Sequence, residues 1–165
     1  MVAGKDGDSR CTSVQKKSER EVVVTRTFDA PARLVFEAWS KPELFRKWWV
    51  PRSMGMTLRS CEMDVRTGGT YRLVFGDDPA SPMTFFGKYI EVVPNKRIVW
   101  TNEESGDAGS VTTVTLDECG GKTLLVLSEL YPTKEALDAA GTGAQEAMHE
   151  TFVQLDELLA ELSGR

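Results

Sequence analysis

The sequence predicts an α+β domain in which a seven-stranded antiparallel sheet wraps around one long C-terminal helix, with two short helices after the first strand. Residues 54–130 consist of short alternating segments separated by turn signals, which is typical of an antiparallel meander. After residue 132 the apolar residues recur every three or four positions, which places them on one side of a helix. A helix with one apolar stripe must bury it, and the sheet is the only large apolar partner that the sequence offers.

The composition favours a single globular domain. The 165 residues are 41% hydrophobic and 27% charged, and a chain of this size buries about two-thirds of its unfolded surface. A net charge of -5 argues against a nucleic-acid partner, which would require clustered Lys and Arg. No apolar run approaches the ~20 residues that cross a bilayer, and the opening MVAGKDGDSR lacks the hydrophobic stretch of a signal peptide. We therefore expect a cytoplasmic protein with neither a membrane nor a nucleic-acid partner.

The first part of the chain predicts a tail, a strand and two helices. Residues 1–20 are polar and end in the charged run QKKSER, so we expect a mobile tail followed by a domain over residues 21–165. The stretch EVVVTRTF is rich in β-branched residues and predicts a strand, and FDAPARLVFEAW then changes to helical spacing with Pro31 in the first turn. Ser40 and Glu43 have the spacing of a capping box for a second helix, which must end before Pro51.

The rest of the chain predicts six more strands and the closing helix. The strands are MTLRSCEMDV, TYRLVF, MTFFGKYIEVV, RIVWTN, SVTTVTLDE and TLLVLSEL. Turn residues join them in pairs, at Gly68–Gly69, Pro94–Asn95 and Gly120–Gly121. The apolar stripe of the closing helix is Ala144, Met148, Phe152, Leu155, Leu159 and Leu162.

Four stretches carry a resemblance to a known family. They are RTFDAPARLVFEAWSKPELFRKWWVP, CEMDVRTGGTYRLVF, FFGKYIEVVPNKRIVWT and AMHETFVQLDELLAEL. In this order they resemble the START-like (SRPBCC) superfamily, and within it the bacterial branch named after the C-terminal domain of the activator of the heat-shock protein ninety ATPase. The resemblance implies a helix-grip fold with a cavity between the long helix and the sheet. It does not choose a function, because the superfamily includes lipid and hormone carriers, polyketide cyclases, toxin-sequestering proteins and chaperone-associated domains.

Trp48 and Trp49 are adjacent at the end of the second predicted helix. Neighbouring residues on a helix point about 100° apart, so the two rings cannot both face the centre of the core. If the helix pair fills the gap between the long helix and the sheet, as the resemblance implies, one ring packs in the core and the other faces the cavity. The sequence leaves open which ring does so, and it leaves open that both serve only in packing.

Alternation along the strands predicts the wall of the cavity. Residues two apart share a face of a strand, so Tyr71 goes with Phe75, and Phe85 goes with Tyr89 and Glu91. The best polar groups for orienting a ligand are Tyr89, Glu91, Asn102 and Glu129, although the carboxylates could equally lie at the rim of the sheet in water. The full predicted set of ligand-binding residues is Trp39, Trp48, Trp49, Tyr71, Phe75, Phe85, Tyr89, Glu91, Trp100, Leu127, Met148, His149 and Phe152.

The sequence offers little catalytic chemistry. The single histidine, His149, could act as a general base, but no serine or cysteine nucleophile can be paired with it from the sequence. Glu62 and Asp64 share one face of a strand, which we interpret as the solvated side of a half-buried strand and not as a metal site. The three cysteines have neither the spacing of a metal site nor that of a disulfide framework. We therefore assign no catalytic residue, metal or cofactor.

These features favour a non-catalytic protein that holds a small hydrophobic or aromatic molecule in the cavity. The alternative is an enzyme of the polyketide cyclase or dehydratase kind, in which an aromatic pocket folds a flexible substrate and a single acid or base completes the reaction. A minor alternative, raised by the family name, is a domain that binds a chaperone. That role belongs to proteins with an additional N-terminal domain, which we do not expect a short tail to supply. The identity of the ligand and the oligomeric state are left open by the sequence.

Overall fold

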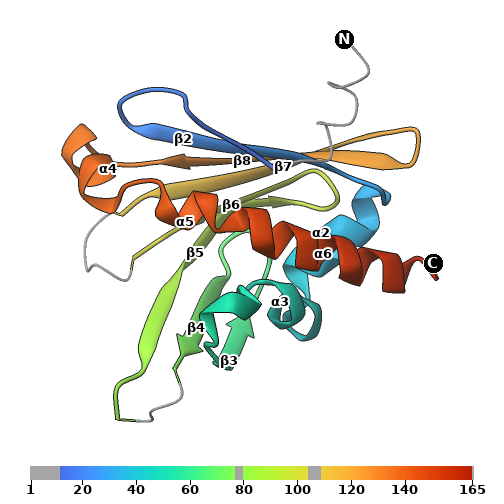
Figure 1. Cartoon of the computed structure of the whole chain (residues 1–165), viewed down its shortest axis with the longest axis horizontal. Coiled ribbons are helices and arrows are strands. Elements are labelled where there is room, and N and C mark those ends of the chain that lie inside the picture. Colours follow the sequence, from blue (N-terminus) through green and yellow to red (C-terminus); the bar gives the residue numbers. More distant parts are fainter. Residues whose placement is uncertain (1–11, 77–79, 104–108, 165) are drawn as a thin grey trace.

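The structure is a computed structural model that describes residues 12–76, 80–103 and 109–164 (Figure 1). Its strands are β1 (Ser13–Lys16), β2 (Glu21–Phe28), β3 (Leu58–Met63), β4 (Thr70–Phe75), β5 (Met83–Val93), β6 (Arg97–Thr101), β7 (Val111–Cys119) and β8 (Lys122–Leu130). Its helices are α2 (Ala32–Ser40), α3 (Pro42–Trp48), α4 (Lys134–Ala140), α5 (Gly143–Glu146) and α6 (Met148–Leu162), with a 3-10 turn η1 (Arg52–Met54).

The strands form one antiparallel sheet in the order β1-β2-β8-β7-β6-β5-β4-β3. Helix α6 runs across one face of this sheet, and α2 and α3 lie at the same face (Figure 1). The α+β arrangement, with a sheet gripping the C-terminal helix, confirms the predicted fold class. From β2 to β8, the order of one strand, two helices and six strands is also as predicted.

The strand count differs by one, because the described part of the chain contains eight strands and the sequence predicts seven. The added strand is β1, which lies within the predicted tail and pairs residues 13–16 with residues 22–25 of β2. Without β1, the outer edge of β2 would present unpaired backbone N–H and C=O groups, and a short polar segment can satisfy them with its backbone alone. Residues 1–11 of the predicted tail lie outside the described residues.

Strand β2 shows how the sheet holds α6. Every second residue of β2 is buried, as the alternation predicts, and one of these residues is Arg26. Its guanidinium forms an ion pair with Asp156 of α6 and lies 5.4 Å from the ring centre of Phe28. The Phe28 ring in turn meets the Phe152 ring of α6 edge to face, with 5.4 Å between the ring centres. Helix α6 is therefore attached to β2 by an ion pair and by aromatic packing.

Helices α2 and α3 meet at Lys41, which ends one and begins the other. The apolar face predicted for α2 is buried. The predicted capping box for α3 is wrong, because Ser40 is the last residue of α2 and no side chain caps α3. Pro42 instead occupies the first turn of α3, where its fixed φ suits a helix and its missing N–H costs no hydrogen bond.

The C-terminal region contains three helices where the sequence predicts one. Helix α4 is capped at its N-terminus by Thr133, whose side-chain oxygen accepts a hydrogen bond of 3.0 Å from the backbone N–H of Ala136. It ends at Gly141, whose φ of 69° is outside the helical range and is readily adopted only by glycine. The short α5 then turns at Ala147 into α6. The break changes the direction of the chain, so that Gln145 of α5 reaches Glu129 at the end of β8, whereas α6 crosses the sheet (Figure 1).

Helix α6 buries the predicted stripe over most of its length. Phe152, Leu155 and Leu159 are buried, whereas Met148 is half-buried and Leu162 is exposed near the end. The side chain of Ala144, the first predicted stripe residue, lies outside the described residues. Among the described helices, none is long and apolar enough to cross a membrane.

Candidate functional site

A cavity of about 510 Å³ lies between the inner face of the sheet and the helices. Small-molecule sites in proteins occupy roughly 300–1,000 Å³. A dry, closed void of this volume would cost about 12 kcal/mol at ~24 cal/mol per Å³, which is comparable to the whole stability of a domain, so the space is filled either by solvent or by a bound molecule. Its wall within the described residues is formed by Trp39, Phe45, Trp49, Val50, Pro51, Met54, Met56, Met63, Tyr71, Leu73, Phe75, Met83, Phe85, Tyr89, Ile98, Trp100, Asn102, Thr112, Leu127, Glu129, Gly143, Ala147, Met148 and Thr151.

Aromatic rings from helices and strands meet on this wall. Trp39 of α2 lies at the centre, with its ring 5.8 Å from that of Trp100 on β6 and 5.7 Å from that of Trp49. The Trp39 indole nitrogen is buried and has no hydrogen-bond partner among the described residues. Trp39 therefore contributes ring surface to the wall, and it contributes no polar contact with the rest of the described chain.

The two adjacent tryptophans have different environments. Trp48 is fully buried, and its indole N–H donates a hydrogen bond of 2.9 Å to the carbonyl oxygen of Ala38. Trp49 is half-buried, stacks on Phe45 at 4.8 Å and lines the cavity. The alternative in which one ring packs in the core and the other faces the cavity is therefore the one observed, and Trp49 is the cavity residue.

The polar groups of the wall gather where β6 ends, β7 begins and β8 ends. We call Asn102, Thr112 and Glu129 the polar corner; all three line the cavity. The Asn102 amide nitrogen donates to the hydroxyl oxygens of Ser110 and Thr112, each at 3.0 Å. The Ser110 hydroxyl donates to one carboxylate oxygen of Glu129 at 2.8 Å, and the Gln145 amide of α5 donates to the other at 2.8 Å. The polar corner is thus held by a hydrogen-bond network that reaches from β6 to α5.

Tyr71 joins β4 to this corner because the neighbouring strand carries a glycine. The Tyr71 hydroxyl donates a hydrogen bond of 2.7 Å to the carbonyl oxygen of Thr101 and lies 3.3 Å from the Asn102 side-chain oxygen. A Cβ atom on Gly87, which pairs with Tyr71, would lie only 2.0 Å from the same Thr101 carbonyl oxygen. Only glycine at position 87 lets the end of β6 approach β5 this closely.

Tyr89 offers a neutral hydroxyl group to the cavity. Burial, assisted by the nearby Cys61 and Asp64 groups, raises the pKa of Tyr89 far above its usual range. The phenol is therefore uncharged at neutral pH, and it can both donate and accept a hydrogen bond. No hydrogen bond from another described residue reaches this hydroxyl, which makes it available to a guest.

Methionines form another part of the wall. We call Met54, Met56, Met63 and Met83 the methionine wall; they come from the segment between α3 and β3, from β3 and from the start of β5. None of them is buried, and Met54 and Met83 are 57% and 46% exposed, which places an opening of the cavity beside them. Methionine side chains are flexible and polarizable, so this wall can adapt to guests of different shape.

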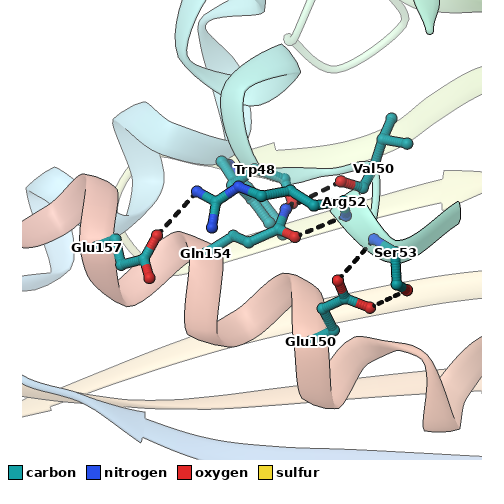
Figure 2. Close-up of polar contacts among 7 residues, drawn as sticks. All are labelled: Trp48, Val50, Arg52, Ser53, Glu150, Gln154 and Glu157. Carbon is teal, nitrogen blue, oxygen red and sulfur yellow. Dashed lines mark hydrogen bonds and ion pairs between the residues drawn. The ribbon is translucent and has the colours of Figure 1, made fainter. Parts of the chain in front are cut away.

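The backbone that carries Met54 is attached to α6 (Figure 2). The buried Gln154 amide nitrogen donates to the carbonyl oxygens of Trp48 and Val50 at 3.0 and 2.9 Å. The Gln154 side-chain oxygen accepts a bond of 2.9 Å from the backbone N–H of Arg52, so that one side chain satisfies three backbone groups (Figure 2). Glu150 accepts hydrogen bonds from the Ser53 backbone and hydroxyl, and these bonds lower the pKa of its carboxyl group.

A comparison with family models shows a match over residues 29–160 to the family described as activator of Hsp90 ATPase homolog 1-like protein. The chain belongs to this family. The matched range contains every residue of the cavity wall given above, so the site lies within the part of the chain that defines membership. The predicted resemblance to the activator-homologue branch of the START-like superfamily is confirmed.

Solved structures share the fold of this activator-homologue family member. A crystal structure of a Rhodobacter sphaeroides protein is 25% identical with a TM-score of 0.80, and the match covers 92% of this chain and 99% of that one. A solution structure of a Staphylococcus epidermidis protein is 25% identical with a TM-score of 0.75 and coverages of 90% and 94%. CalU16 from Micromonospora echinospora, at 20% identity, a TM-score of 0.61 and coverages of 92% and 85%, shows the same fold. No protein with a curated description matches the chain.

The structure of this family member brings most of the predicted residues together. Those that line the cavity are Trp39, Trp49, Tyr71, Phe75, Phe85, Tyr89, Trp100, Leu127 and Met148. Whether they contact a ligand stays a prediction. Trp48 and Phe152 do not line the cavity, because both are fully buried in the core with their ring centres 6.2 Å apart.

Two polar residues of the predicted set lie away from the cavity. The pairing of β5 with β6 shifts between Tyr89 and Glu91, so Ile90 is an extra residue that reverses the alternation. Glu91 consequently faces solvent, where its carboxylate forms an ion pair of 2.7 Å with Arg97. His149 is exposed, because it follows Met148 on α6 and therefore points about 100° away from it.

The sequence prediction missed several residues that shape the site. Thr112 could have been found, because it is two residues before Val114 on β7 and so shares its inward face. Gln154 carries a weaker signal, since it is a polar residue beside the apolar stripe of the last helix. The methionine wall has no periodic signal at all. Among the described residues, no three His, Cys, Asp or Glu side chains are placed to hold a metal ion.

Proposed function

We propose that this protein binds a small, largely apolar or aromatic molecule in the cavity. The observation that carries the proposal is that eight of the wall residues are aromatic, in a chain with 4 Trp, 3 Tyr and 7 Phe, and that they leave a space of about 510 Å³. Aromatic side chains that serve only in packing fill an interior to crystal-like density. The mostly apolar wall would supply affinity, and the hydroxyl of Tyr89 and the polar corner would orient the guest.

The four indole N–H groups allow a direct test by NMR. N-phenylnaphthylamine, an uncharged aromatic probe, is added to the protein in steps while the four indole signals are followed. Trp39, Trp49 and Trp100 line the cavity, so their signals should shift together and saturate. Trp48 donates to Ala38 in the core and serves as the internal control, with a smaller shift. The absence of any saturable shift would contradict the proposal.

A matched pair of variants locates the binding. Phe85 and Phe86 are neighbours on β5 with exposures of 37% and 40%, but Phe85 lines the cavity and Phe86 points to the other face of the sheet. Phe85→Ala should weaken probe binding about tenfold, since it removes an apolar contact of roughly 1.4 kcal/mol. Phe86→Ala should change it less than twofold. Equal effects of the two substitutions would place the probe outside the cavity.

One observation favours a second function, an enzyme of the cyclase or dehydratase kind. Glu129 places a carboxylate on a wall that is otherwise mostly apolar, where it could transfer a proton to or from a bound substrate. Mass spectrometry of a bound compound after incubation separates the two functions. A binding protein returns the compound unchanged, whereas an enzyme of this kind returns a cyclised or dehydrated product that is lost in Glu129→Gln.

A further inference from the structure

Among the described residues, the cavity wall carries one acidic side chain and no basic one. Glu129 is the only carboxylate among the described wall residues, and no Lys, Arg or His belongs to that wall. Tyr71 and Tyr89 are the other ionisable side chains on it, and burial raises the pKa of Tyr89 further above neutral pH, where a phenol is uncharged in any case. A guest with a negative charge would therefore find a carboxylate and no cation, in a setting where water screens charges weakly.

The polar corner also presents acceptors in preference to donors. The Asn102 amide hydrogens point to Ser110 and Thr112, and the hydroxyl of Ser110 points to Glu129. The Gln145 amide likewise donates to Glu129, and the Tyr71 hydroxyl donates to a backbone carbonyl. These donors are engaged within the protein, and the hydroxyl of Thr112 accepts from Asn102 and keeps its own O–H. A carboxylate only accepts hydrogen bonds, so Glu129 adds acceptor oxygens and no donor to the corner.

Aromatic faces surround the same space. Trp39, Trp49 and Trp100 form one side of the wall, and the rings of Tyr71 and Tyr89 lie 5.7 Å apart next to the corner. The face of an aromatic ring carries partial negative charge, and it attracts an ammonium group most strongly when water is displaced. The aromatic rings, the carboxylate and the other acceptors thus all favour a guest that carries a positively charged hydrogen-bond donor.

We infer that the guest is an amphipathic amine, with an aromatic or apolar body against the tryptophans and a protonated nitrogen at Glu129. This inference rests on the proposed function, because it assigns the chemical class of the molecule that the cavity holds. The ammonium donates hydrogen bonds to the carboxylate of Glu129 and to the other acceptors of the polar corner. The hydroxyl of Tyr89, which can also accept, lies on the same wall.

A set of three compounds with one ring system tests the inference. Naphthylmethylamine, naphthylmethanol and naphthylacetate are cationic, neutral and anionic at neutral pH. The affinity of each for the whole chain is measured by isothermal titration calorimetry, and a separate NMR titration follows the indole signals to show whether the compound binds in the cavity. We expect the amine to bind at least tenfold more tightly than the acid, with the alcohol between them. Affinities within threefold of one another, or an acid that binds best, would overturn the inference while leaving cavity binding intact. If none of the three binds, the proposed function fails as well.

Glu129→Gln tests the role of the carboxylate, and Glu91→Gln is the matched control, because Glu91 is exposed on β5 and does not line the cavity. Glu129→Gln should weaken the amine about tenfold, strengthen the acid and change the alcohol less than threefold. Glu91→Gln should change none of them more than twofold. Equal loss for all three compounds in Glu129→Gln would show damage to the corner and overturn the role of charge. If Glu129→Gln does not fold, the order of the three affinities in the unaltered protein still shows whether the cavity prefers an amine.

Discussion

The two walls of the cavity differ in what holds them and in what they offer a guest. The polar corner, Asn102, Thr112 and Glu129, belongs to the ends of paired strands and is fixed by side-chain hydrogen bonds. The methionine wall offers flexible apolar side chains, and the described hydrogen bonds near its η1 segment fix the backbone and not the methionines. One wall therefore suits recognition of a definite chemical group, and the other suits bodies of varied shape.

The difference shows how one cavity can combine selectivity with tolerance. A hydrogen bond or charge contact depends steeply on distance and angle, so the groups that make it must be held in place. Dispersion contacts are individually weak and summed over many atoms, so the side chains that make them can rearrange at little cost. Under the proposed function, the cavity separates these two requirements in space, and substitutions at Gln154, at Asn102 and on the methionine wall test whether the separation is real.

The largest effect is expected at Gln154, which holds the backbone that carries the methionine wall. Gln154→Leu leaves two carbonyl oxygens and one N–H without their partner, and it should lower the free energy of unfolding by about 3 kcal/mol. Urea denaturation followed by tryptophan fluorescence measures the change. Probe binding should weaken as well, because Trp49 and Val50 lose the anchor beside them.

Glu157→Gln is the control for Gln154→Leu, since Glu157 is also on α6 and also contacts the η1 segment. Its ion pair with Arg52, at 2.8 Å, is exposed on both sides, with side-chain exposures of 66% and 52%. Exposed ion pairs contribute at most about 1 kcal/mol, so Glu157→Gln should be nearly neutral. If both variants unfold at the same urea concentration, the buried amide is not what holds the segment.

An intermediate effect is expected at Asn102 in the polar corner. Asn102→Ala removes the donor to Ser110 and Thr112, and the loss should cost about 1.5 kcal/mol of stability because these hydroxyls lie in buried residues. It should also reduce discrimination between amine and acid, since Ser110 positions Glu129. Thr112→Ser, which keeps the hydroxyl, is the control. Unaltered stability and unaltered discrimination in Asn102→Ala would show that the corner is not a fixed network.

The smallest effect is expected on the methionine wall. Met54→Leu and Met83→Leu should change the free energy of unfolding by less than about 0.5 kcal/mol, because both side chains are largely exposed and leucine has a similar volume. Their effect should instead appear in ligand range, measured as affinities for amines with rings of increasing width. A destabilisation larger than that of Asn102→Ala would remove the distinction between an adaptable wall and a fixed one.

Much of the fold follows from local patterns, and particular residues show where such patterns stop. The segment EVVVTRTF matches β2 at both ends, and TYRLVF and MTFFGKYIEVV match β4 and β5. Alternation also placed Tyr71, Phe85 and Tyr89 on the cavity wall. It failed at Glu91, because the extra residue Ile90 reverses which face of β5 the following side chains occupy, and no turn residue or glycine beside it signals this bulge in the sequence. The polar composition of residues 1–20 predicted a mobile tail and so missed β1, whose pairing depends on the edge of β2 and not on its own sequence.

By itself, the sequence determined the order of strands and helices from β2 to β8, the family and the presence of an aromatic inner surface, because alternation, helical spacing and turn residues act over a few neighbouring positions. Only the tertiary structure decided that Trp49 and not Trp48 faces the cavity, that Glu129 stands on the wall while Glu91 and His149 face solvent, and that Gln154 supports η1. These outcomes depend on where α6 crosses the sheet and on how many residues oppose each other across two strands. Both are set by contacts between segments far apart in the chain.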